Sequence, residues 1–153
     1  MNKITPFLWF DGQAQEAAEF YVSIFKNSKV LNISPGPDGK AFIVSFVLDG
    51  QEITALNGGP EFKFNEAFSF FVNCEDQTEV DTLWEKLTAG GEEQQCGWLK
   101  DRYGLSWQIV PRALGELMGG PDPVRSQRVM QAMLKMVKID IRGLQRAYEG
   151  DAD

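Results

Sequence analysis

WLKDRYGLSWQIVP (residues 98–111) consists of two apolar segments on either side of the polar turn KDRYG. Gly104 suits the left-handed position of such a turn, so the pattern predicts a strand, a turn and a closing strand over residues 105–111. Gln108 is the one amide in this apolar closing strand. A buried amide needs a hydrogen-bonding partner, so its neighbours decide whether Gln108 belongs to a binding site.

The residues before this stretch predict a strand and a helix. AFSFFVN (67–73) has the composition of a strand, and Asp76 is placed to cap the helix that follows. That helix has one apolar face and is stopped by two glycines; the residues are Val80, Leu83, Trp84, Leu87, Gly90 and Gly91. EEQQCGWLKD (92–101) predicts a single strand, which gives this half the order strand–helix–strand–strand.

The first half of the chain has nearly the same order. ITPFLWF (4–10) predicts a strand, and Asp11-Gly12 offers an N-cap for an amphipathic helix. Three strands are predicted after it, VLNIS (30–34), AFIVSFVL (41–48) and QEITALN (51–57). Asp49-Gly50 marks the last connection as a hairpin.

The end of the chain is predicted to be helical. A helix over 113–118 precedes one capped by Asp122-Pro123, and a last short helix begins at Asp140. The middle helix is expected to point four apolar residues inward: Val129, Met130, Met133 and Val137.

These patterns predict an α+β fold of paired βαβββ units with C-terminal helices. We expect one domain over residues 1–153, made of a βαβββ unit (3–60), a βαββ unit (66–111) and a helical extension (112–148). Because one helix of this length cannot cover three or four strands alone, the two units are expected to lay their sheets against each other or to curl each sheet around an enclosed space. Either arrangement gives a central cavity between strands.

Composition excludes several classes of function. A net charge of −7 argues against a nucleic-acid binder and against attraction to anionic membranes, and no run of 18 apolar residues is present. Two cysteines, Cys74 and Cys96, and the lack of a signal-peptide pattern predict a cytoplasmic protein with reduced thiols. The chain has no histidine, which removes the commonest metal ligand and general base together.

Four stretches resemble the vicinal oxygen chelate (glyoxalase/bleomycin-resistance) superfamily, and within it the PhnB-like branch. They are ITPFLWFDGQAQEAAEFY, FVLDGQEITALNGGP, FKFNEAFSFFVNCED and CGWLKDRYGLSWQIVP. Members of this branch often carry the label 3-demethylubiquinone-9 3-methyltransferase. The first strand is followed by one glycine, Gly12, not by the glycine-rich loop of a common adenosylmethionine-binding fold, so the residues give methyl transfer no support.

The resemblance also implies where a metal would bind in metal-dependent relatives. The ligand positions carry over to Pro6, roughly Asn57, Ser69 and Gln108. Proline has no side-chain donor and the others are neutral, so we expect no metal and no cofactor. The resemblance implies instead a cavity lined by a mainly apolar set of residues, namely Leu8, Phe10, Asn57, Ser69, Phe71, Trp98 and Gln108.

The leading hypothesis is a homodimeric, PhnB-like protein that binds a small, largely apolar or aromatic molecule in a metal-free cavity. Whether it is an enzyme stays open, and no catalytic residue is identified. One alternative is a metal-dependent lyase or dioxygenase of the glyoxalase type. Another is a dimeric interaction module whose helical tail (112–148) makes the contact and whose cavity is vestigial.

Overall fold

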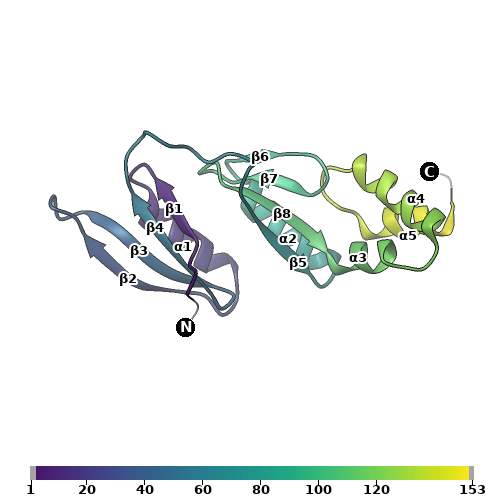
Figure 1. Ribbon diagram of the computed structural model, residues 1–153, viewed down its shortest axis with the longest axis horizontal. Coiled ribbons are helices and arrows are strands. Elements are labelled where there is room, and N and C mark those ends of the chain that lie inside the picture. The colour runs from purple at the N-terminus through teal and green to yellow at the C-terminus, as the bar shows by residue number, and fades with distance from the viewer. Residues whose placement is uncertain (1–2, 152–153) are drawn as a thin grey trace. The chain divides into compact units, whose positions relative to one another are not determined.

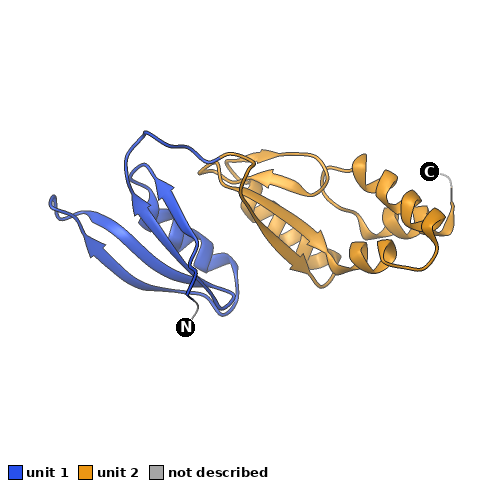
Figure 2. Cartoon of the chain, viewed as in Figure 1, with its two compact units in different colours: residues 1–64 blue, residues 65–153 orange. Residues whose placement is uncertain are grey.

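The computed structural model describes residues 3–151. The chain divides into two compact units, residues 1–64 (unit 1) and 65–153 (unit 2), drawn in different colours in Figure 2. Each unit holds one four-stranded sheet and the helix that packs on it, so the predicted α+β class is confirmed. No helix in the described part of the chain has the length and apolar character needed to cross a membrane.

Unit 1 follows the predicted βαβββ order. Its elements are β1 (Phe7–Phe10), α1 (Ala14–Ile24), β2 (Lys29–Pro35), β3 (Ala41–Leu48) and β4 (Gln51–Asn57). They form sheet A in the order β1-β4-β3-β2, with β1 parallel to β4 and the remaining pairs antiparallel (Figure 1). Asp49 and Gly50 both have positive φ, 47° and 81°, as the predicted two-residue hairpin requires.

Helix α1 covers one face of sheet A. It buries Ala14, Ala17, Ala18 and Tyr21, and the Tyr21 ring lies 6.4 Å from that of Phe46 on β3. The register of the sheet places a set of buried residues on the same face as Phe46, namely Leu8, Phe10, Val44, Ile53 and Ala55. The core of unit 1 therefore lies between α1 and this face, and the other face of sheet A, its far face, points away from α1.

The start of α1 differs from the prediction. The N-cap is Gln13, which makes no side-chain capping bond, rather than the Asp11-Gly12 pair. The backbone N–H of Ala14 instead donates to Asn57 Oδ1 at 2.8 Å, so a residue at the end of β4 caps the helix. A cap supplied from a distant strand has no local sequence signature.

Unit 2 contains a second sheet. Its elements are β5 (Ser69–Cys74), α2 (Gln77–Thr88), β6 (Glu92–Glu93), β7 (Trp98–Lys100) and β8 (Ser106–Pro111). They form sheet B in the order β5-β8-β7-β6, with β5 parallel to β8 (Figure 1). Asp76 caps α2 as predicted, because its carboxylate accepts the N–H of Glu79 at 2.9 Å.

The predicted strand over 92–101 is wrong. The segment forms two short strands, β6 and β7, separated by Cys96 and Gly97 at φ 62° and 82°. The N–H groups of these two residues donate to the carbonyls of Met136 and Val137, both at 2.8 Å. This contact with a segment 40 residues away holds the backbone out of the strand conformation, and the second unit is βαβββ rather than βαββ.

Three helices end the chain: α3 (Arg112–Met118), α4 (Pro123–Leu134) and α5 (Ile141–Glu149). They have a small core of their own, in which Val129, Ile139 and Leu144 are fully buried. Two of the residues predicted to point inward are instead exposed: Met130 lies on the exposed side of α4, and Val137 lies beyond the end of α4 at Leu134. Val129 and Met133 pack as predicted.

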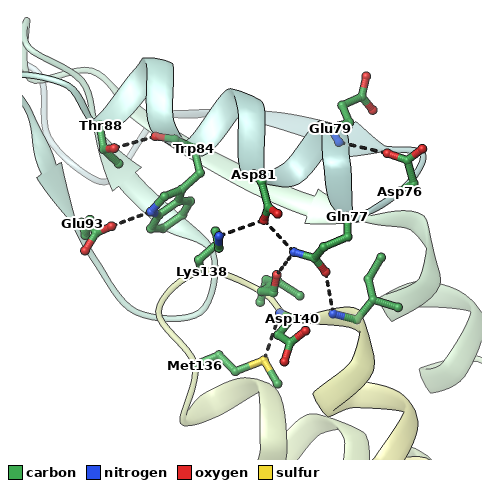
Figure 3. Close-up of polar contacts among 12 residues, drawn as sticks. Asp76, Gln77, Glu79, Asp81, Trp84, Thr88, Glu93, Met136, Lys138 and Asp140 are labelled. Atoms are coloured by element: carbon green, nitrogen blue, oxygen red, sulfur yellow. Dashed lines mark hydrogen bonds and ion pairs between the residues drawn. The ribbon is translucent and has the colours of Figure 1, made fainter.

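Gln77 joins these helices to α2 (Figure 3). Its Nε2 donates to the Ile139 carbonyl at 3.0 Å, and its Oε1 accepts the N–H of Ile141 at 2.8 Å. Beside it, Lys138 Nζ lies 2.8 Å from Asp81 Oδ1. Two side chains of α2, Gln77 and Asp81, therefore bond both the backbone and a side chain of the segment that leads into α5.

Candidate functional site

The residues of sheet B separate onto two faces. Phe70, Val72, Trp107 and Ile109 are paired with one another on the face covered by α2, whose apolar residues are buried there. The opposite face, which we call the far face of sheet B, carries Ser69 beside Ser106 and Phe71 beside Gln108. Trp98 and Lys100 of β7 lie next to Gln108 and Ser106 on the same face. The predicted alternation of β5 and β8 is thus confirmed.

Gln108 has a partner on this face. Its Nε2 donates to Ser69 Oγ at 3.0 Å, which leaves the Gln108 carbonyl oxygen, its second N–H and the Ser69 hydroxyl proton for another group. Two aromatic residues flank the pair, Phe71, which is 53 % exposed, and the half-buried Trp98. The far face therefore combines neutral polar groups with accessible aromatic surface.

Ser106 was not among the predicted site residues, although it shares the face with Gln108. It is fully buried, and within residues 3–151 its Oγ has no hydrogen-bond partner. A buried hydroxyl without a partner is uncommon in folded proteins. Alternation along the closing strand already predicts that Ser106 shares a face with Gln108. The structure adds that Ser106 is buried, which the sequence did not show.

Lys100 and Glu66 add charge at the edge of the face. Lys100 Nζ lies 3.2 Å from Glu66 Oε2, and Gln94 Nε2 donates to the same oxygen at 3.2 Å. The hydrogen bond from Lys100 is the largest cause that lowers the pKa of the Glu66 carboxyl, followed by bonds from the backbone and Gln94. A hollow of about 540 Å³ adjoins this pair, lined by Glu66, Glu92, Glu93, Gln94, Gln95 and Trp98.

Three residues predicted for the cavity lie elsewhere. Leu8 and Phe10 are each 3 % exposed on the face of sheet A that α1 covers, so they are core residues. Asn57 belongs to the same face, and its amide is occupied by the N–H of Ala14 and the carbonyl of Ala41. Alternation assigned each residue to one of two faces correctly, but it did not reveal which face α1 would cover.

The far face of sheet A was missed by the sequence analysis. It carries Phe7, which is 60 % exposed, and Trp9, whose Nε1 donates to the Gly59 carbonyl at 2.9 Å and whose ring stands edge-on to Phe62. The exposed aromatic side chains alternate with Leu8 and Phe10 along β1, and this was the signal available in the sequence.

The donor groups at the four positions implied for a metal do not fit a divalent ion. Pro6 offers no side-chain donor, the Asn57 amide is occupied by backbone groups, and Ser69 and Gln108 are neutral and bonded to each other. Among residues 3–151 no group of three or more His, Cys, Asp or Glu side chains is arranged to hold a metal.

Comparison with known proteins agrees with this architecture. The family model of 3-demethylubiquinone-9 3-methyltransferase matches residues 2–110, which end just before α3. A solved structure from Bacillus cereus, described as a putative 3-demethylubiquinone-9 3-methyltransferase, PhnB protein, is 35% identical with a TM-score of 0.68. The match covers 72% of this chain and 99% of that one. No curated protein matches the chain.

Two more distant structures share the fold alone. Protein PA1353 from Pseudomonas aeruginosa is 19% identical with a TM-score of 0.61, covering 72% of this chain and 98% of that one. The fosfomycin resistance protein FosX from Listeria monocytogenes, solved with Mn(II) and sulfate, is 17% identical with a TM-score of 0.51, covering 69% and 86%. From the family match and the Bacillus relative, the chain belongs to the PhnB-like 3-demethylubiquinone-9 3-methyltransferase family.

Proposed function

We propose that this protein binds a small, largely apolar or aromatic molecule on the far face of sheet B, without a metal ion. The observation that supports the proposal is the Ser69–Gln108 hydrogen bond on a face that also carries Phe71 and Trp98. Small-molecule sites are commonly apolar surfaces with a few well-placed polar groups, and this face has that character. Any catalysis there would depend on orienting the ligand through neutral hydrogen bonds.

Tryptophan fluorescence tests the proposal, because Trp98 lies beside Gln108. Purified protein is titrated with a set of small aromatic compounds, and Trp98→Phe identifies the tryptophan that reports binding. Gln108→Leu is expected to weaken the binding of any hit by about tenfold, since one or two hydrogen bonds of about 1 kcal/mol each are lost.

Ser69→Ala removes the partner of Gln108 and is expected to weaken the binding of a hit, and Ser34→Ala is its matched control. Ser34 Oγ accepts a hydrogen bond from the Asn32 amide at 3.1 Å on an exposed strand of unit 1, so the two serines make the same kind of contact. The control is expected to leave binding unchanged. If no compound in the set binds, or if both serine variants behave alike, the far face of sheet B is not the site.

Methyl transfer, which the family description names, is tested with adenosylmethionine. In this structure β1 is followed by a bend with Gly12 at φ 80° and then by α1, which is not the glycine-rich loop of a common adenosylmethionine site. We expect no heat of binding in a calorimetric titration with adenosylmethionine. A measurable dissociation constant would contradict this expectation and would support methyl transfer as the activity.

We further propose a cytoplasmic homodimer. Exposed aromatic residues such as Phe7 and Phe62, 60% and 63% exposed, favour association, and both cysteines are free thiols, as a reducing compartment maintains them. Light scattering after gel filtration gives the molecular mass, and a monomer at micromolar concentration would contradict the dimer.

A further inference from the structure

An ion pair lies beside the strand that carries the candidate site. Strand β8 lies between β5 and β7 in sheet B (Figure 1). Lys100 is on β7 beside Ser106 of β8, while Glu66 lies in the turn that leads into β5. Lys100 Nζ lies 3.2 Å from Glu66 Oε2, and Gln94, which follows β6, donates to the same oxygen, so the ion pair lies at β7, the strand next to Ser106.

Ser106 is the register neighbour of Lys100 on β8 and is fully buried. Its Oγ finds no partner in the described part of the chain. The neighbouring Gln108 has used one N–H on Ser69 and keeps a second one. Ser106, Gln108 and Lys100 are therefore three donors on adjacent positions of one face.

A carboxylate is the group that satisfies several donors at once, because it only accepts hydrogen bonds and carries the charge that complements an ammonium. Glu66 already brings a carboxylate to Lys100 and Gln94, from a side chain that is 53% exposed. An exposed ion pair of this kind is weak, so another carboxylate of similar charge can replace it.

Building on the proposed function, we propose that the ligand is a small carboxylic acid with an aromatic or apolar body. Its carboxylate displaces Glu66 from Lys100 and accepts from Ser106, and its body lies against Phe71 and Trp98. Glu66 then acts as an internal competitor that holds the donors in the absence of ligand. The step is an exchange of non-covalent partners and needs no co-reactant.

Glu92 offers a matched control for Glu66. Its register partner is Lys100, but it lies on β6, on the side of β7 away from β8 and Ser106. Replacing either glutamate by glutamine removes one negative charge near Lys100. Only Glu66→Gln removes the carboxylate that forms the ion pair with Lys100.

The test uses phenylacetate and its neutral counterpart phenylacetamide as probes, titrated into the full chain at neutral pH and low salt. Wild-type protein is expected to bind phenylacetate more tightly than phenylacetamide. Glu66→Gln should tighten phenylacetate binding by about three- to tenfold without changing phenylacetamide, whereas Glu92→Gln should change either by less than about twofold. Lys100→Met and Ser106→Ala should each weaken phenylacetate binding selectively.

The outcomes separate the two proposals. If phenylacetamide binds as tightly as phenylacetate, and Glu66→Gln and Glu92→Gln change the affinity for phenylacetate equally, the carboxylate proposal is wrong. The proposal of binding on this face then still stands. If neither probe and no compound of the larger set binds, both fail. Because Glu66 and Glu92 are exposed, both variants are expected to fold, and the comparison does not depend on the more buried Ser106.

Discussion

Asn57 and Gln108 carry the same amide group, and their partners separate their roles. The Asn57 amide is bonded to two backbone groups, of Ala14 and Ala41, and so it fixes the start of α1 against sheet A. The Gln108 amide is bonded to a side chain, Ser69, and keeps polar groups available. An amide used by the backbone stabilises the fold, and one that is partly free can recognise a ligand.

Asp101 shows how the DRYG turn holds its shape. The carboxylate is 2% exposed and accepts the N–H groups of Tyr103 and Leu105 and the indole N–H of Trp107 at 2.8, 3.1 and 2.9 Å. The two backbone bonds close the turn that the sequence predicts, and the indole bond adds a link from the turn to the core.

We predict that Asp101→Asn lowers the free energy of unfolding by about 1.5–3 kcal/mol, because charge-assisted hydrogen bonds are replaced by weaker ones. Chemical denaturation measures the change. Asp38→Asn, at an exposed turn where the carboxylate accepts one N–H, from Lys40, is the control and should cost less than about 0.5 kcal/mol. Equal losses in the two variants would contradict the structural role of Asp101.

Cys74 is predicted to be inert in the folded protein. Burial is the main cause that raises its pKa from 9.0 to about 12, and the charge of Glu79 adds to it. A thiol-specific disulfide reagent at pH 8 should label Cys74 only after unfolding, since the thiolate is the reactive form. Rapid labelling of Cys74 in the native state would contradict this.

The same shift makes stability depend on pH. Well below pH 9 the Cys74 thiol is protonated in both the folded and the unfolded chain, so its contribution to the free energy of unfolding is fully present. As pH rises from 9.0 toward about 12, the unfolded chain loses the proton first, so stability falls. Cys74→Ala should show a shallower decline over this window than the wild type.

At the scale of elements, α2 joins the sheet to the C-terminal helices. Its apolar face packs on sheet B, while Gln77 in its first turn bonds the backbone on both sides of Asp140 (Figure 3). The helix was predicted from its apolar face and its cap, but a polar residue that bonds a segment about 60 residues away is not visible in a local pattern.

We predict that Gln77→Leu destabilises the protein by about 1–2 kcal/mol and speeds amide hydrogen exchange in α5, because the Ile139 carbonyl and the Ile141 N–H lose their partner. Gln15→Leu is the matched control. Gln15 donates to Glu19 four residues on, as Gln77 donates to Asp81, and its bond is exposed and lies within α1. Unchanged exchange in α5 of the Gln77 variant would show that other contacts hold these helices.

At the scale of the whole molecule, the family match ends at residue 110 and α3–α5 follow it. These helices are bonded to sheet B through Cys96 and Gly97, whose N–H groups donate to residues 136 and 137. The Ile139 side chain also packs closely at Gly97, where an added Cβ would lie 3.0 Å from it. The extension is thus a structural part of unit 2.

We predict that ending the chain after Pro111 lowers the stability of unit 2 by at least about 2 kcal/mol, from the loss of these two backbone hydrogen bonds. Ending it after Gly150 should leave stability unchanged within about 0.5 kcal/mol. Light scattering on both proteins tests the interaction-module hypothesis, because a loss of dimer only in the shorter chain would assign the dimer contact to the helices. An unchanged mass in both would exclude that role.

The sequence by itself determined the order of the elements apart from the division into β6 and β7, and also the Asp49-Gly50 hairpin, the Asp76 cap and the two faces of β5 and β8. These features depend on residues that are near one another along the chain: alternation assigns side chains to faces, and turns and caps involve two to four residues. The grouping of Ser69, Phe71, Trp98 and Gln108 on one face follows from them, together with strand pairing.

Only the tertiary structure decided which face of each sheet its helix covers, and so it placed Leu8, Phe10 and Asn57 in or beside the core of unit 1. It also decided the interruption between β6 and β7 and the Lys100–Glu66 ion pair. Periodicity distinguishes two faces but does not say which one is buried, because burial comes from contacts between segments far apart in the chain.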